Sequence, residues 1–177
     1  MLFRSDEAYN EYLRPELRAH SVAWLKKYPN LLLTRTFSKV YGLAGLRVGY
    51  AVGSAGVADL MNRVRQPFNV NSISLAAAAA ALDDHAFVRQ SYELNLAGMA
   101  QMTGALQKLD LAFIPSFGNF VTFKVKDAKG VNLSLLKSGV IVRPIAGYGL
   151  PDWLRVSIGT ENENARFLAS LKAAVSA

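Results

Sequence analysis

The sequence contains no cysteine among its 177 residues, which excludes disulfides and thiolate metal sites. Its two histidines, His20 and His85, are far apart and lack the spacing of metal ligands, so no metal site is expected. Long apolar runs are also missing, because the apolar stretch 72–82 is shorter than the roughly 20 residues of a membrane-spanning helix. No signal-peptide pattern opens the chain. We therefore expect a cytoplasmic protein with no membrane partner.

Positive charge is in excess: the sequence has 20 basic and 13 acidic residues, which gives a formal net charge of +7. The basic residues are scattered, with no run of five or more, and aromatic residues do not interleave with them as in an RNA-binding motif. Nucleic acid is therefore not an expected partner. The positive charge is compatible with attraction of phosphorylated small molecules or with an ordinary solvated surface.

The hydrophobic pattern alternates between strands and helices. Residues 7–28 are expected to be helical or loop-like, with Pro15 opening a helix. We expect strands over 31–36, 46–52, 119–126, 140–143 and 154–158, and helices over 56–65, 72–82, 86–109, 131–137 and 160–175. Thr160 and Glu163 form a capping box that starts the last helix. This order predicts an α/β fold, with part of a parallel sheet in a domain over 1–82 and a smaller α+β domain over 83–177 that begins with a long helix.

A lysine and an arginine flank a glycine-containing turn in residues 38–50. Lys39 follows a serine at the end of an apolar run, and Arg47 comes eight residues later, beyond two glycines. A lysine amine can bind an aldehyde covalently and can move a proton, provided that its pKa lies well below the usual value of about 10.4. The planar fork of arginine suits a phosphate. The segment therefore suits an enzyme that holds an aldehyde covalently and its phosphate ionically.

Residues 38–50 resemble the cofactor-lysine segment of the pyridoxal-phosphate (PLP) aminotransferases of fold type I (class I/II), most closely that of the histidinol-phosphate aminotransferases. The resemblance implies that PLP is the cofactor, that Lys39 is the catalytic residue that binds it, and that Arg47 binds its phosphate. It also implies part of a three-layer αβα large domain. Thr36 and Ser38, beside the lysine, could supply hydroxyls to the phosphate or satisfy their own turn.

A second segment, residues 6–9, resembles the Asp-Glu-Ala-Tyr segment of the same family. By this resemblance Asp6 pairs with the protonated ring nitrogen of PLP, and Tyr9 hydrogen-bonds the phenolic oxygen of the ring. A carboxylate beside the nitrogen keeps it protonated, so that the ring can accept electrons. Asp6 lies 33 residues before Lys39, the span of one β-crossover-β unit. Taken alone, the segment would be a helix N-terminus with acidic residues in its first turn.

Two arginines near the C-terminal end complete the resemblance. In similar aminotransferases the arginine of the Leu-Arg-Val-Ser strand binds the substrate α-carboxylate, and Arg155 stands at that position. Arg143 resembles the family arginine that helps to bind the substrate near its phosphate or carboxylate. The alternative is that both arginines lie on an exposed sheet face and pair with carboxylates of the protein itself.

The resemblance covers residues 6–175, and the family segments that precede Asp-Glu-Ala-Tyr, including a phosphate-binding loop at a helix N-terminus, are not in the sequence. We therefore expect the C-terminal half of such an enzyme, whose family members are homodimers. The implied activity is transfer of an amino group between histidinol phosphate, or a similar amino acid, and the 2-oxo acid 2-oxoglutarate, in histidine biosynthesis. Two alternatives stay open: a truncated, non-catalytic fragment, and another PLP enzyme of the same fold, such as a related decarboxylase or another aminotransferase.

Overall fold

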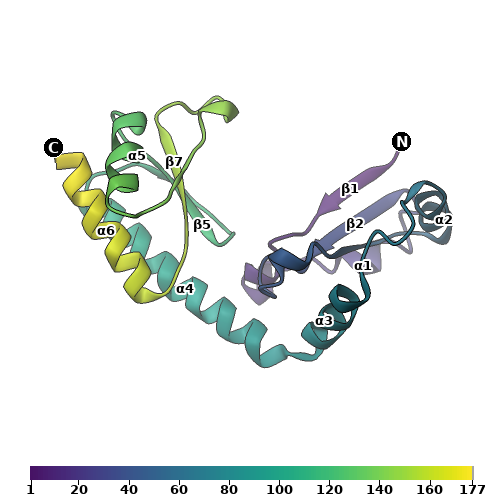
Figure 1. The fold of residues 1–177 in the computed structure, drawn as a ribbon. Coiled ribbons are helices and arrows are strands. Elements are labelled where there is room, and N and C mark those ends of the chain that lie inside the picture. Colours follow the sequence, from purple (N-terminus) through teal and green to yellow (C-terminus); the bar gives the residue numbers. More distant parts are fainter. Residues whose placement is uncertain (177) are drawn as a thin grey trace. The chain divides into compact units, whose positions relative to one another are not determined.

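A computed structural model describes residues 1–176 of the chain. The structure divides into two compact units, the first over Met1–Ser91 and the second from Tyr92 onward. Both units combine strands with helices (Figure 1), which confirms the expected α/β class. The domain boundary expected after residue 82 stays a prediction.

The first unit contains a three-stranded sheet of order β1-β2-β3 (Figure 1), formed by β1 (Phe3–Asp6), β2 (Leu31–Thr36) and β3 (Gly49–Val52). β1 runs parallel to β2, but β3 runs antiparallel to it. The expectation of a parallel sheet is therefore wrong for β3. The segment 37–48 between them contains only a short 3₁₀ turn, so no crossover helix carries the chain back to the start of β2 for a parallel pairing.

Helices in the first unit follow the expected ranges only after β3. α2 (Ala55–Val64) and α3 (Ser72–Asp83) form close to the predicted positions. Residues 7–28 instead form single turns, the 3₁₀ segments Asn10–Tyr12 and Pro15–Leu17 and the four-residue α1 (Ser21–Trp24). Pro15 does open a helical turn, as its fixed φ favours, but the turn ends after three residues.

A small buried cluster of Phe37, Val48 and Ala78 connects the turn after β2 to α3. Partly buried hydrophobic side chains pack against it, namely Tyr41, Leu43, Leu46, Tyr50, Val70 and Ala81. The buried Ser74 of α3 donates a hydrogen bond of 2.9 Å from Oγ to the carbonyl oxygen of Leu46. The lysine turn is therefore attached to a helix by both packing and a hydrogen bond.

The second unit contains an antiparallel sheet of order β4-β5-β7-β6. Its strands are β4 (Phe113–Ile114), β5 (Phe120–Lys124), β6 (Arg143–Pro144) and β7 (Trp153–Ser157). β4 was not predicted, because two residues are too short to show a periodic pattern. The strand expected over 140–143 is displaced to β6, while those expected around β5 and β7 form.

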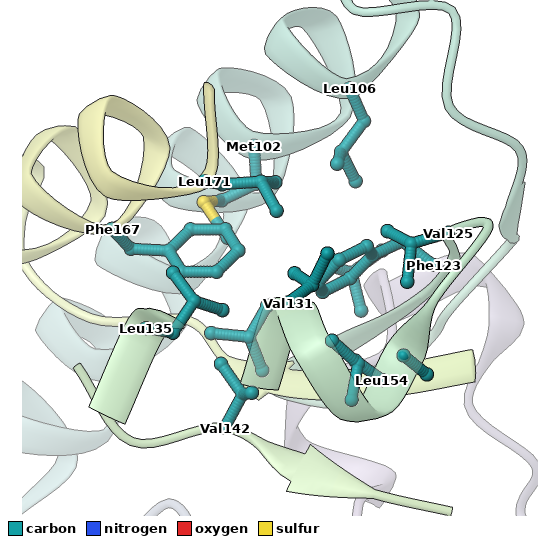
Figure 2. Packing of buried hydrophobic residues seen from close by; sticks show 13 residues of the cluster. Met102, Leu106, Phe123, Val125, Val131, Leu135, Val142, Leu154, Phe167 and Leu171 are labelled. Atoms are coloured by element: carbon teal, nitrogen blue, oxygen red, sulfur yellow. The ribbon is translucent and has the colours of Figure 1, made fainter. Parts of the chain in front are cut away.

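Three helices cover the core of this unit: the C-terminal part of α4 (His85–Lys108), α5 (Ala128–Lys137) and α6 (Glu161–Ser176). Figure 2 shows the side chains of Met102, Leu135, Phe167 and Leu171 converging from these helices. Phe167 meets Phe123 of β5 edge-on, with ring centroids 5.7 Å apart. This cluster is the larger of the two cores and fixes how β5 and β7 lie under the helices.

The predicted capping box at the start of α6 is confirmed. The amide of Thr160 donates to Glu163 Oε2 over 2.8 Å, and the amide of Glu163 donates back to Thr160 Oγ1 over 3.4 Å. Two amides at the helix start, which have no partners within the helix, are thereby satisfied.

Candidate active site

One edge of the first sheet collects the residues predicted to bind the cofactor. Asp6 ends β1 and Thr36 ends β2, and because these strands are parallel their carboxyl ends meet at the same edge. β3 begins at this edge, where Gly49 pairs with Thr36. A Cβ atom built on Gly49 would lie 2.7 Å from the carbonyl oxygen of Arg35, so only glycine permits this close start of β3.

Lys39 follows β2 and lies near Tyr9, which follows β1. The lysine Nζ is 5.3 Å from the centroid of the tyrosine ring. The carbonyl oxygen of Lys39 accepts a hydrogen bond of 2.9 Å from the amide of Gly42, whose φ of 70° is the left-handed conformation that glycine adopts readily. The structure therefore brings Lys39 and Tyr9 together, although they are far apart in sequence.

Asp6, Thr36 and Ser38 are each tied to a local turn. Asp6 Oδ1 accepts a hydrogen bond from the amide of Ala8 over 3.2 Å, and Thr36 Oγ1 accepts one from the amide of Ser38 over 3.0 Å. Both are side-chain turns between residues two apart. They orient the side chains, and the hydroxyl proton of Thr36 and the second carboxylate oxygen of Asp6 stay available for a ligand.

Arg47 does not lie in a strand, contrary to the strand expected over 46–52. It follows a 3₁₀ turn over Ala44–Leu46 and has φ 52° and ψ 45°, the left-handed conformation that side chains other than glycine rarely adopt. Its Nη1 donates to the carbonyl oxygen of Ala44 over 2.9 Å. Leu46 and Val48 pack into the small core on either side of it. The exposed guanidinium therefore belongs to a strained turn at the sheet edge, which local alternation could not reveal.

A partly buried ion pair beside this edge escaped the sequence analysis. Arg35 Nη2 lies 2.8 Å from Glu7 Oε2, and Arg35 Nε donates to the same oxygen over 2.9 Å. Burial alone would lower the pKa of Arg35, but hydrogen bonding to Tyr50 and Glu7 raises it, and the net shift is upward. The pair follows from the register of the parallel strands, in which Asp6 stands opposite Thr34 and the next residues, Glu7 and Arg35, face each other. The sequence carried no signal for it, because no local pattern fixes that register.

Two further groups beside the ion pair have raised pKa values. Burial raises the pKa of the Glu11 carboxyl, against the lowering effects of a backbone hydrogen bond and of Arg35. Burial, followed by the nearby Glu11 carboxylate, raises the pKa of Tyr41. The polar groups below the sheet edge are therefore only partly accessible to water.

The two arginines predicted to bind substrate lie in the second unit and meet there. Arg143 of β6 stands directly opposite Arg155 of β7, which is opposite Thr122 of β5 on its other side. The Arg155 guanidinium carbon lies 4.9 Å from the centroid of the Phe120 ring. Neither arginine forms an ion pair with any residue of the range 1–176. Like charges directly opposite each other are unfavourable, so this pair is suited to an anion.

The fold and the lysine-bearing sheet edge define an α/β protein with a group of basic side chains in each unit, Lys39 and Arg47 in the first and Arg143 and Arg155 in the second. The family model for aminotransferase class I and II matches residues 1–171. The chain belongs to this family of enzymes.

Named relatives share its sequence closely over part of their length. The chain is 64% identical over 170 residues to histidinol-phosphate aminotransferase 1 of Dechloromonas aromatica, a match that covers 96% of this chain and 47% of the relative. It is 61% identical over 166 residues to histidinol-phosphate aminotransferase 1 of Thiobacillus denitrificans, covering 94% and 43%. The chain therefore spans about half the length of the curated relatives it matches.

A solved structure agrees in fold. The histidinol-phosphate aminotransferase of Sinorhizobium meliloti in complex with pyridoxal-5'-phosphate superimposes with a TM-score of 0.89 at 30% identity, covering 99% of this chain and 49% of that one. The expected partial PLP-aminotransferase fold is thus confirmed.

Along residues 1–176, the structure has no helix long and apolar enough to cross a membrane.

Proposed function

We propose that this chain carries the cofactor-lysine and substrate-arginine parts of a PLP-dependent aminotransferase. The complete enzyme would transfer an amino group between histidinol phosphate and 2-oxoglutarate, as a step of histidine biosynthesis in the cytoplasm. It would act as a homodimer. The observation that carries the proposal is the convergence of Lys39, Tyr9, Asp6 and Arg47 at one edge of the first sheet.

The groups at this edge fit PLP by their chemistry. Lys39 supplies the primary amine, and Arg47 supplies a guanidinium that forms no ion pair within residues 1–176. Asp6 retains a carboxylate oxygen beyond its turn hydrogen bond. Thr36 and Ser38 offer hydroxyls beside the lysine. PLP carries an aldehyde, a phosphate and a basic ring nitrogen. These groups require, respectively, an amine, a cation with hydroxyls, and a carboxylate.

When bound, PLP would supply an aldehyde that bonds to amines and a ring that accepts electrons from the substrate α-carbon. Lys39 would hold the cofactor through its Nζ amine, and that amine, once free, could carry a proton between the substrate α-carbon and the cofactor carbon. Asp6 would place a negative charge beside the ring nitrogen, Tyr9 would hydrogen-bond the ring oxygen, and Arg47 would bind the phosphate. Arg155 orients the substrate through its α-carboxylate, and Arg143 adds charge for a second anionic group.

A second candidate is a member of the family that does not retain PLP by itself. The observation that favours it is that the chain spans about half the length of its relatives. The two candidates differ in whether this polypeptide binds PLP through Lys39.

PLP titration of the purified chain, followed by absorption spectroscopy, separates them. The proposal expects a shifted absorption band of bound PLP that is absent in Lys39→Ala and retained in Lys26→Ala, which removes an exposed lysine of the same unit. A band of equal strength in all three proteins, or in none, contradicts cofactor binding by this chain.

The substrate arginines need a separate test. In PLP-loaded protein, Arg155→Lys should raise the concentration of glutamate needed for half-maximal spectral change by at least about tenfold, because a bidentate charge-assisted contact becomes a single one. Glutamate is the amino acid that corresponds to 2-oxoglutarate, and it carries the α-carboxylate that Arg155 is proposed to bind. Lys124→Arg, an exposed position on the adjacent strand, is the matched control. An unchanged response in Arg155→Lys would remove this residue from the substrate site.

A further inference from the structure

The ion pair between Glu7 and Arg35 is the least exposed charge pair in the first unit. Both contacts, of 2.8 Å and 2.9 Å, go to the single oxygen Oε2 of Glu7. The side chains of Arg35 and Glu7 keep only 23% and 9% of their exposure. Charge-assisted hydrogen bonds in such a partly desolvated position are stronger than those on an open surface.

The ion pair sits immediately behind a proposed cofactor residue. Glu7 follows Asp6, and its amide donates to the carbonyl oxygen of Thr34 over 2.9 Å, which extends the ladder between β1 and β2 by one residue. Successive side chains of a strand point to opposite faces. Asp6 therefore projects from one face of the sheet, with Thr34 and Thr36, while Glu7 and Arg35 are held on the other.

The third strand anchors the same pair. Arg35 stands opposite Tyr50 of β3, and hydrogen bonding to Tyr50 contributes to the raised pKa of Arg35. The Tyr50 ring packs on Phe37 of the small core, with centroids 5.7 Å apart. Glu7 is thus connected through Arg35 to the core on which the lysine turn rests.

We propose that Glu7 and Arg35 are positioning residues that hold Asp6 at the end of β1 in the orientation needed to face the ring nitrogen of PLP. This inference rests on the proposed function. Within residues 1–176, the carboxylate of Asp6 has one hydrogen bond, from the amide of Ala8. Its direction therefore depends on the backbone of residues 6–8. The ion pair adds a side-chain contact to the backbone hydrogen bond from Glu7 to Thr34 that ties this backbone to β2.

The first experiment measures amide hydrogen exchange in the chain without cofactor. Glu7→Gln keeps the shape of the side chain but removes its charge, and Glu16→Gln is a matched control on an exposed turn. We expect the Ala8 amide to exchange about tenfold faster in Glu7→Gln, the factor that corresponds to losing one charge-assisted hydrogen bond. Amides of the β5–β7 ladder should not change. An unchanged Ala8 amide overturns the proposal.

The second experiment asks whether the effect reaches the ring nitrogen. Wild type, Glu7→Gln and Glu16→Gln are titrated with PLP and with its 1-deaza analogue, in which carbon replaces the ring nitrogen. We expect Glu7→Gln to raise the dissociation constant of PLP about tenfold and to leave that of the analogue nearly unchanged. Equal losses for both ligands would mean that the pair only stabilises the fold, which overturns the positioning role.

The two proposals fail in different ways. If wild type binds neither ligand, the proposed function fails for this chain, and the exchange of the Ala8 amide still decides whether the ion pair orders Asp6. If wild type binds PLP while Glu7→Gln binds it equally well, the proposed function stands and the positioning role is refuted.

Discussion

The left-handed backbone at Arg47 leads to a prediction in which stability and cofactor binding change separately. Arg47 has φ 52° and ψ 45°, a conformation that costs an L-residue with a Cβ atom about 1 to 2 kcal/mol. Replacing it by glycine relieves this strain, whereas replacing it by alanine does not. Both substitutions remove the guanidinium and its hydrogen bond to Ala44, so their difference isolates the backbone.

The size of the difference follows from two opposing effects. Relief of the left-handed strain favours glycine by about 1 to 2 kcal/mol. Glycine loses more backbone freedom on folding than alanine, and this entropy cost offsets about 0.5 to 1 kcal/mol of that stabilisation. The free energy of unfolding of Arg47→Gly should therefore exceed that of Arg47→Ala by about 0.75 kcal/mol, the difference between the midpoints of these two ranges. Both variants should weaken PLP binding equally, since neither can bind the phosphate.

Urea unfolding followed by tryptophan fluorescence measures this difference. The chain has two tryptophans, Trp24 in the first unit and Trp153 in the second, so a Trp153→Phe background reports on the first unit alone. Arg63, on the exposed face of α2, is a control position, because in a helix the order reverses and alanine is favoured over glycine by about 1 kcal/mol.

The result that would refute the reasoning is an alanine variant at position 47 that is as stable as the glycine variant, while position 63 shows the normal helical order. Arg47 would then not carry the strain that its dihedral angles indicate. Unequal PLP affinities of the two variants would likewise contradict a role that depends on the guanidinium alone.

Three other predictions concern packing, capping and pH. Leu171→Ala should lower the free energy of unfolding of the second unit, read from Trp153 fluorescence, by about 2 to 5 kcal/mol, because Leu171 is fully buried; the exposed control Leu133→Ala should change it by about 0.5 kcal/mol or less. Asn71→Ala should cost about 1 kcal/mol in the first unit, since Asn71 Oδ1 accepts the amide of Ser74. Hydrogen bonds from the amide and hydroxyl of Thr160 lower the pKa of Glu163, so the stability it contributes is present above its ordinary pKa and disappears as pH falls through the lowered value. Glu163→Gln should remove that part of the pH dependence of unfolding.

Each of these has a distinct contrary outcome. Equal losses for the buried and exposed leucines would mean that the core of Figure 2 is not the stabilising cluster. An unchanged first unit in Asn71→Ala would show that the start of α3 does not depend on its cap. A Glu163→Gln protein with the same acid profile as wild type would rule out the capping box as a source of pH dependence.

Features that depend on neighbours in sequence were predictable. The apolar run before Thr36 forms β2 with Leu33 fully buried, and the capping box at Thr160 forms as its four residues indicate. The residue types and order around Lys39 were also sufficient to identify the family. In each case the relevant interactions lie within a few residues, or the chemistry resides in the side chain itself, so no knowledge of distant contacts is needed.

Features that depend on strand register were decided by the tertiary structure. Glu7 and Arg35 are 28 residues apart and meet because β1 and β2 pair in one particular register. Arg47 resembles a strand residue by alternation, but packing of its neighbours into the small core holds it in a left-handed turn. Arg143 and Arg155 face each other only after β6 and β7 align. The sequence by itself determined which chemical groups are present and most local elements. Which groups meet was decided by long-range strand pairing and packing. The free energy of pairing and packing is a sum over contacts between residues far apart in the sequence, and no local stretch of sequence contains those contacts.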